Sequence, residues 1–216
     1  NALGNTINLL INDGQGLFSS SSVLPVAGSP RKVLTADLDG DGDLDMAVLG
    51  VTANNTGSTL SLYTNLGNHI FSIYQSLAFG LASDAALADV DGDGDLDMLV
   101  TKRTPVGELE VLPNTGTGRL GTGLTYLVGD NPSGLTTADV DGDGDMDALQ
   151  TNGSFTGTVS VRLNGGTTVL ATAAAQAALL GVYPNPAHGE VRVQVPAGAA
   201  QVALYDALGR LARTVP

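Results

Sequence analysis

The sequence repeats one nine-residue acidic pattern three times, and the spacing of the copies limits the folds open to the chain. The copies begin at Asp37, Asp89 and Asp139, so they recur after 52 and then 50 residues. Each copy, here called the first, second or third loop, has aspartate at positions one, three, five, seven and nine and glycine at four and six. A period of about 50 residues is typical of a small β-sheet repeated around an axis, the blade of a propeller.

The aspartates of each loop would crowd together if the glycines allowed a tight turn. Five unpaired carboxylates at short range repel one another strongly. A hard cation removes this repulsion and prefers oxygen ligands, of which Ca²⁺ accepts about six to eight in flexible geometry. The pattern therefore predicts about three Ca²⁺ ions, one per loop. The candidate ligands are Asp37, Asp39, Asp41, Asp43, Asp45, Asp89, Asp91, Asp93, Asp95, Asp97, Asp139, Asp141, Asp143, Asp145 and Asp147.

Other acidic loops share parts of this pattern. An EF-hand needs a bidentate glutamate at its twelfth position, where this chain has Val48, Val100 and Gln150. The calcium-binding repeats of a parallel β-helix have a period of about nine residues, which is far too short. An ordinary polar turn is also rich in aspartate and glycine, but it does not need the same nine-residue pattern three times.

The net charge is a property of the loops rather than of the whole surface. The chain carries 22 acidic and 9 basic residues, with a formal net charge of −13. Fifteen of the acidic residues lie in the loops, so the remainder of the chain is slightly basic. Three divalent ions would bring the formal charge to about −7. A negatively charged protein is repelled by the phosphates of nucleic acid, so we expect no nucleic-acid partner.

Each loop is flanked by short apolar runs, and a third run with period-two alternation follows. Alternation predicts a strand with one buried face. We expect four antiparallel strands per repeat, in the order first strand, loop, second, third and fourth strand. The expected first strands are 33–36, 85–88 and 135–138, the second 46–49, 98–100 and 148–149, the third 59–63, 108–112 and 158–163, and the fourth 71–79 and 120–128.

The N-terminal stretch matches only the second half of a repeat, with strands expected at 5–10 and 17–26 and no acidic loop before them. The prediction is an all-β chain of about three and a half blades. Closed propellers have about four to eight blades, so we expect this chain to be part of a larger propeller in a longer protein. The expected units are a half-blade at 1–30 and blades at 31–82, 83–132 and 133–170.

The segments 36–45, 88–97 and 138–147 resemble the calcium loops of FG-GAP/VCBS repeats, the blades of integrin α-subunit heads and of many bacterial surface proteins. The resemblance covers roughly residues 1–170 and is closer to the bacterial branch, because the Phe-Gly and Gly-Ala-Pro signatures are not evident. It implies that the side chains at positions one, three, five and nine bind the ion. It also implies that Asp43, Asp95 and Asp145, at position seven, contribute their backbone carbonyls.

The composition changes after the third repeat. An alanine-rich stretch at 171–180 predicts a linker, and it is followed by Tyr-Pro-Asn-Pro at 183–186 and Leu-Tyr-Asp-Ala-Leu-Gly-Arg at 204–210. These segments resemble the start of the C-terminal sorting domain of bacterial type IX secretion cargo. The resemblance implies a partial sorting domain at 181–216, folded as a truncated small β-sandwich and recognised by the secretion machinery. The protein would then be secreted or held on the bacterial cell surface.

Groups suited to catalysis are scarce. The two histidines, His69 and His188, lie in different predicted domains without a nucleophile nearby in the pattern, so we expect surface residues. Carboxylates committed to a cation are poor proton donors. Lys102 and Arg103 are expected to be ordinary solvated charges. These features predict a protein that is not an enzyme.

The expected function is a calcium-binding extracellular module that contacts an unidentified protein or glycan as an adhesin or scaffold. The alternatives are a carbohydrate-binding propeller and an accessory module of a secreted polysaccharide-degrading enzyme. The chain has no tryptophan, five tyrosines and four phenylalanines, which gives few rings for stacking on a sugar. No apolar run approaches the roughly 20 residues needed to span a membrane, so no membrane span is expected.

Overall fold

The computed structural model describes residues 1, 3–153 and 157–165, and after them the strands within 181–215. The chain divides into two compact units, Asn1–Ala171 and Thr172–Pro216, which are described separately. Every regular element among the described residues is a β-strand, which confirms the all-β class. Among these residues there is no helix of a length and hydropathy that would cross a lipid bilayer.

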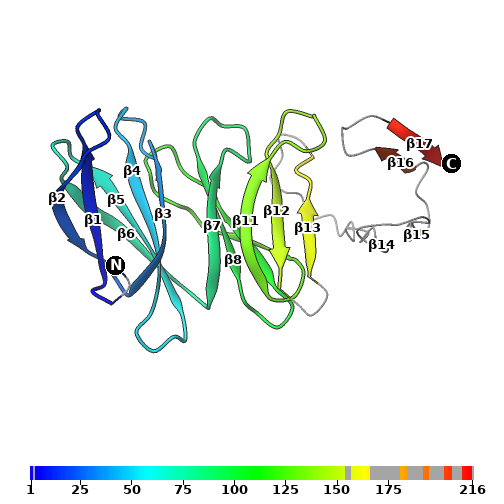
Figure 1. Cartoon of the computed structure of the whole chain (residues 1–216), viewed down its shortest axis with the longest axis horizontal. Coiled ribbons are helices and arrows are strands. Elements are labelled where there is room, and N and C mark those ends of the chain that lie inside the picture. The colour runs from blue at the N-terminus through cyan, green and yellow to red at the C-terminus, as the bar shows by residue number, and fades with distance from the viewer. Residues whose placement is uncertain are drawn as a thin grey trace. The chain divides into compact units, whose positions relative to one another are not determined.

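The first unit consists of a hairpin and three antiparallel sheets in sequence order (Figure 1). In each sheet consecutive strands are neighbours, as predicted for a blade. The sheets begin slightly before the predicted blade starts at 31, 83 and 133. The hairpin is β1 (Thr6–Asn12) and β2 (Phe18–Pro25); the first sheet is β3 (Ser29–Ala36), β4 (Asp45–Val51), β5 (Ser58–Asn65) and β6 (Phe71–Phe79); the second sheet is β7 (Ala82–Ala88), β8 (Asp97–Lys102), β9 (Glu108–Leu112) and β10 (Leu124–Leu127); and the third sheet is β11 (Pro132–Ala138), β12 (Asp147–Asn152) and β13 (Thr158–Arg162).

The fourth strand of the second sheet is shorter than predicted. The run at 120–128 contains only β10. The side-chain amide of Gln75, on β6 of the first sheet, donates to the carbonyl of Leu120 at 3.0 Å and accepts from its N–H at 2.9 Å. The next residue, Gly121, donates its N–H to Pro113 at 2.7 Å. Leu120 thus keeps an isolated antiparallel bridge to Asn114 of its own repeat, while its N–H and carbonyl bond to Gln75 of the first sheet.

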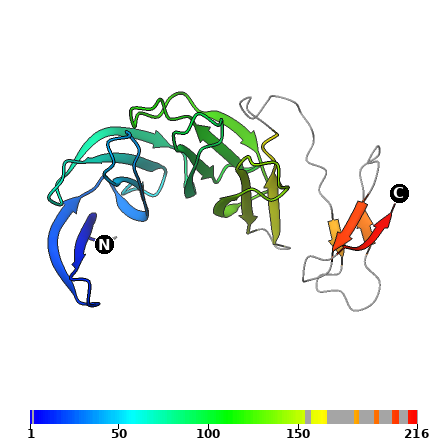
Figure 2. The same cartoon turned by 90° about the horizontal axis from the view of Figure 1, so that it is seen from above.

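Apolar faces of successive sheets pack on one another. Leu60 and Leu62 of the first sheet share a buried cluster with Met98 and Val100 of the second. Leu99, which points to the opposite face of the same strand, packs in a separate cluster with residues of the third sheet. Figure 2 shows the hairpin and the three sheets following one another along a curve. The first and second sheets therefore each contribute side chains to two cores and the third sheet to one, and burial of this apolar surface is the main source of stability.

The second unit contains two short hairpins. Strand β14 (Gly181–Tyr183) pairs antiparallel with β15 (Arg192–Gln194), and β16 (Val202–Tyr205) pairs antiparallel with β17 (Leu211–Val215). All four strands lie within 181–216, the segment for which the resemblance implied a small β-sandwich. The expected linker at 171–180 and the Pro-Asn-Pro segment lie outside the described residues, and the sandwich stays a prediction from the sequence.

One carboxylate joins the first strands of all three sheets. Asp84, on β7, accepts a hydrogen bond from the Lys32 ammonium of β3 at 2.6 Å and from the Leu135 backbone N–H of β11 at 2.8 Å. Its side chain is only 18% exposed, so water provides little substitute for these partners. Asp84 therefore ties three successive sheets together at a point where apolar packing alone would not fix their relative position.

We expect the Asp84→Ala substitution to lower the free energy of unfolding by about 1–3 kcal/mol, because a partly buried amide and an ammonium lose their acceptor. Urea denaturation in calcium-containing buffer measures the change. The control is Asp130→Ala, at an exposed loop position, which should change the value by no more than about 0.5 kcal/mol. Equal losses in the two variants would show that Asp84 does not join the sheets.

Candidate metal centres

Each acidic loop joins the first and second strands of its sheet. The ladder of these two strands places the residue just before the loop opposite the ninth residue of the loop. The eight residues between must therefore close on themselves in a small space. The pairs are Ala36 with Asp45, Ala88 with Asp97, and Ala138 with Asp147.

The two glycines of each loop have backbone conformations that other residues rarely adopt. In the first loop Gly40 has a φ of 77° and Gly42 a φ of 92°. The equivalent glycines of the other loops have φ values between 77° and 98°. Positive φ is strained for a residue with a Cβ atom, so glycine is required at both positions. This explains why both glycines recur in all three copies.

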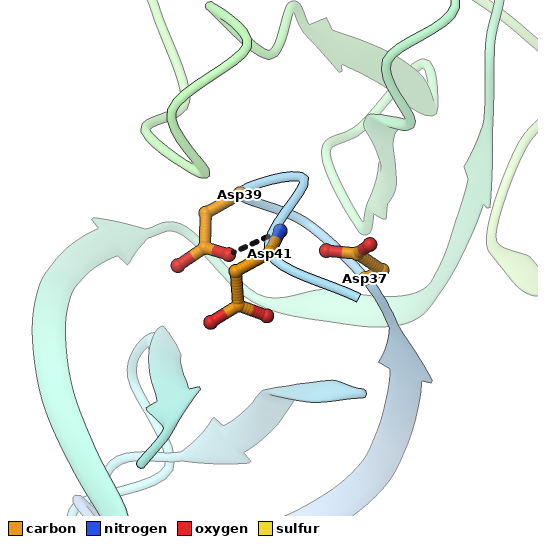
Figure 3. A group of neighbouring side chains, drawn as sticks. All are labelled: Asp37, Asp39 and Asp41. Atoms are coloured by element: carbon orange, nitrogen blue, oxygen red, sulfur yellow. Dashed lines mark hydrogen bonds between the residues drawn. The ribbon is translucent and has the colours of Figure 1, made fainter. Parts of the chain in front are cut away.

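The loop backbone holds the acidic side chains in place. The two carboxylate oxygens of Asp37 accept from the N–H groups of Gly40 and Gly42 at 2.8 and 3.0 Å. Asp39 accepts from the N–H of Asp41 at 3.3 Å, and Figure 3 shows these three aspartates around one turn of the chain. The second and third loops repeat the same set of bonds. The acidic groups are therefore positioned by the fold of each loop.

Three carboxylates of each loop approach one another closely enough to share an ion. In every group, one oxygen from each residue lies within 4.8 Å of the others. Calcium–oxygen distances are about 2.3–2.6 Å, so two ligands of one ion are separated by at most roughly twice that distance. The spacing and the all-oxygen donor set fit a hard divalent cation. The groups are Asp37, Asp39 and Asp41; Asp89, Asp91 and Asp97; and Asp139, Asp141 and Asp143.

The remaining predicted ligands lie in the same loops but outside these groups. Asp43, Asp95 and Asp145 stand at position seven, where the resemblance assigns the role to the backbone carbonyl. Asp93 belongs to the second loop, and its side chain accepts from the N–H of Asp95 at 2.9 Å. Asp45 and Asp147, at position nine, accept hydrogen bonds from backbone N–H groups at position two of their loop and near the end of the third strand.

The ninth aspartate of each loop is completely buried and is bonded through both oxygens. In the second loop, Asp97 accepts from the N–H of Val90 at 3.0 Å and from the N–H of Asn114 at 2.7 Å. The ninth residue thus clamps position two of its loop to the end of the third strand. The sequence predicted only a ligand role for these aspartates, and the clamp was not predicted. The same bonds join Asp45 to Leu38 and Asn65, and Asp147 to Val140 and Asn164.

Two carboxylates of the second loop have a pKa above the ordinary value for aspartate. Burial raises the pKa of Asp97, and the hydrogen bonds from Val90 and Asn114 only partly oppose this. Burial also raises the pKa of Asp91, and the charges of Asp93 and Asp89 add to the effect. A bound cation would favour the ionised forms of these groups.

An open groove of about 420 Å³ lies between the first and second sheets. Its charged residues are Lys102 and Glu110, which form a salt bridge of 3.0 Å, and Lys102 makes a second bridge of 2.8 Å to Glu108. The Lys102 side chain is 15% exposed, so the expectation of a solvated charge was wrong. The cross-strand position of Lys102 opposite Glu108 is the reason for this pairing. Apolar side chains of Leu77, Phe79 and Leu112 line the rest of the groove together with Ala78, Gly80 and 121–123.

His69 belongs to none of the metal groups found among the described residues. His69 is exposed in the turn between β5 and β6, as expected of a surface residue. His188 lies outside the described residues.

We expect Asp97→Ala to destabilise the protein by about 2–4 kcal/mol even in chelator, because two buried N–H groups lose a charged acceptor without any ion being involved. Chemical denaturation in EDTA measures this loss. Asp93→Ala, at an exposed position of the same loop, is the matched control and should have an effect within about 0.5 kcal/mol under those conditions. A loss that appears for Asp97→Ala only in the presence of calcium would refute the clamp.

Comparison with known proteins gives one match. A family model described as the FG-GAP-like repeat matches residues 2–48 and 89–150, which together make up half of the chain. The matched segments include all three acidic loops, whereas β7, the strand before the second loop, lies outside them. Searches of curated proteins and of solved structures found no match. The repeated blade-like sheets, the loops and this match lead to one conclusion: the chain belongs to the FG-GAP-like repeat family.

Proposed function

We propose that this protein is a non-catalytic, calcium-binding repeat module that binds one ion in each acidic loop and contacts another protein or a surface outside the cell. The observation that carries the proposal is the threefold occurrence of one loop in which three carboxylates converge. Repeats of this family are typically extracellular, where calcium is abundant enough to fill sites of modest affinity.

Calcium suits these loops better than magnesium does. Magnesium demands near-ideal octahedral geometry and gives up its water reluctantly, whereas calcium accepts more oxygen ligands in irregular positions. The proposed ligands are the side chains at positions one, three, five and nine and the backbone carbonyl at position seven. The ninth carboxylate can accept the clamp hydrogen bonds and also bind an ion. Each of its oxygens has two lone pairs, and the clamp occupies only one lone pair on each oxygen.

The interaction role is proposed from the repeat architecture and the family match. Completion of a larger propeller and export by type IX secretion are proposed from the sequence resemblances alone. A glycan ligand is the second candidate, and the groove beside Phe79 favours it because this ring is next to a paired Lys102 and Glu110. Glycan-dependent retention on an affinity column that Phe79→Ala abolishes would favour this candidate over a protein partner.

Removal of calcium should lower the melting temperature strongly. A site stabilises the fold by about 2.7 kcal/mol when the free ion is 100-fold above its Kd, and about 1 kcal/mol corresponds to roughly 2–4 °C in a domain of this size. With three sites, the difference between calcium and EDTA should be roughly 15 °C or more by calorimetry. Magnesium should restore only a small part of it. An unchanged melting temperature would be incompatible with the proposal.

Ion counting should give about three calcium ions per chain, and fewer if one loop is disabled. The triple substitution Asp89→Asn, Asp91→Asn and Asp93→Asn should reduce the stoichiometry by one, because neutral amides are much weaker ligands for a hard cation. The matched control replaces the same number of aspartates outside the loops, at Asp13, Asp130 and Asp206. Equilibrium dialysis with elemental analysis measures both, and a value near four in the parent protein would reveal a site outside the loops.

A further inference from the structure

Two buried asparagines connect acidic loops that belong to different sheets. Asn114 is 4% exposed and Asn164 is 2% exposed, and each follows the third strand of its sheet. The backbone N–H of Asn114 donates to Asp97 of the second loop at 2.7 Å. Its side-chain Nδ2 donates to the carbonyl of Leu38, at position two of the first loop, at 2.8 Å. One residue is therefore bonded to two loops at once.

The third sheet repeats this arrangement one step further along the chain. Asn164 donates its backbone N–H to Asp147 of the third loop at 2.8 Å. Its Nδ2 donates to the carbonyl of Val90, at position two of the second loop, at 2.6 Å. Because the same bonds occur at equivalent positions of two sheet junctions, they are a feature of the repeat and not of one contact.

These bonds join with the ninth-position clamps into one continuous path. The residue at position two uses its carbonyl for the asparagine of the next sheet and its N–H for the ninth aspartate of its own loop. All members of the path have side chains that are no more than 8% exposed. In order, the path runs through Asp45, Leu38, Asn114, Asp97, Val90, Asn164 and Asp147.

The turn after Asn114 also packs tightly against two loops. A Cβ atom at Gly116 would lie 2.8 Å from a carboxylate oxygen of Asp95 in the second loop. A Cβ atom at Gly118 would lie 3.2 Å from the Cβ of Asp39 in the first loop, and the Gly118 carbonyl accepts from the Tyr74 hydroxyl at 2.8 Å. A rearrangement of either loop would therefore displace this turn, which has little free space on either side.

Position two of the third loop has a different environment. Val140 is 46% exposed, whereas the equivalent Leu38 is 2% and Val90 is 8% exposed. Asn65, the last residue of the third strand of the first sheet, donates its Nδ2 to the carbonyl of Leu44 within its own repeat at 3.0 Å. Asn65 therefore occupies the equivalent position without bonding to another loop, which makes it a natural control.

We propose that Asn114 and Asn164 are positioning residues that couple neighbouring metal loops, so that calcium bound at one loop raises the calcium affinity of the next. This inference rests on the proposed function, that the loops bind calcium. A bound ion restricts the backbone motion of its loop. The asparagine is hydrogen-bonded to both loops, so the backbone of the neighbouring loop is restricted as well. The second ion then meets a loop that is already partly ordered, and the coupling is reciprocal.

The test measures the calcium affinity of the second loop with the first loop intact and disabled. The N–H signals of Gly92 and Gly94 in ¹H–¹⁵N spectra report the second loop separately, because both groups bond to Asp89 there. Disabling the first loop by Asp37→Asn, Asp39→Asn and Asp41→Asn should weaken calcium binding at the second loop by roughly fivefold or more. An unchanged affinity would overturn the coupling.

The role of Asn114 is then tested in proteins with the first loop intact and with the first loop disabled. With Asn114→Ala, disabling the first loop should no longer change the affinity of the second loop. With Asn65→Ala, the full effect of disabling the first loop should remain. If Asn114→Ala does not fold, Asn164→Ala applies the same test to the second and third loops and should leave the coupling of the first and second intact. Persistence of coupling in the folded asparagine variants would overturn their role.

The outcomes separate this inference from the proposed function. Failure of the parent protein to bind calcium at all would overturn both. Three ions that bind independently, with no effect of disabling a neighbouring loop, would overturn the coupling while calcium binding stands.

Discussion

The buried carboxylate at the ninth position of each loop is the group on which the local structure depends. Burial of an isolated charge is costly unless hydrogen bonds or a counter-charge compensate it. Asp97 receives two backbone hydrogen bonds, which hold the loop against the end of the third strand, and burial raises its pKa by more than these bonds lower it. Loop shape and strand ending are thus linked through one side chain, which is also one of the proposed ligands.

The assembly of the sheets depends on two kinds of contact with different physical roles. Apolar packing between successive sheets supplies most of the stability, but it is not directional and tolerates small shifts. Hydrogen bonds between sheets are directional and fix relative positions. Asp84 joins the first strands, Gln75 binds the backbone of Leu120, and Asn114 bonds to the first loop from the second sheet. These polar contacts determine how each sheet is placed on the one before it.

This organisation explains how a calcium-dependent module could remain rigid without disulfide bonds. The chain has no cysteine, so no covalent cross-link is available to it. The proposed ions would compensate the acidic loops, and the asparagines would connect those loops across the sheets. Outside the cell, where calcium is plentiful, such a module would present its exposed loops and groove on a fixed frame.

The sequence by itself determined the local features. Period-two alternation identified most strands, and the aspartate–glycine pattern identified the loops, because strand alternation and the positive φ of Gly40 and Gly42 are set within a few residues. The candidate ligands of each loop also came from this pattern, since all of them lie within nine consecutive residues. The loop glycines could be recognised in the sequence because the turn requires them at two fixed positions.

Only the tertiary structure decided the features that join distant segments. Asn114 and Leu38 are 76 residues apart, and Asn164 and Val90 are 74 residues apart, so no local pattern could reveal their bonds. The bonds between Gln75 and the backbone of Leu120 likewise join residues of different sheets, 45 positions apart in the sequence. A local pattern specifies how a segment pairs and turns, whereas the partner of a buried polar group depends on which sheet packs beside it, and that is fixed only when the chain folds.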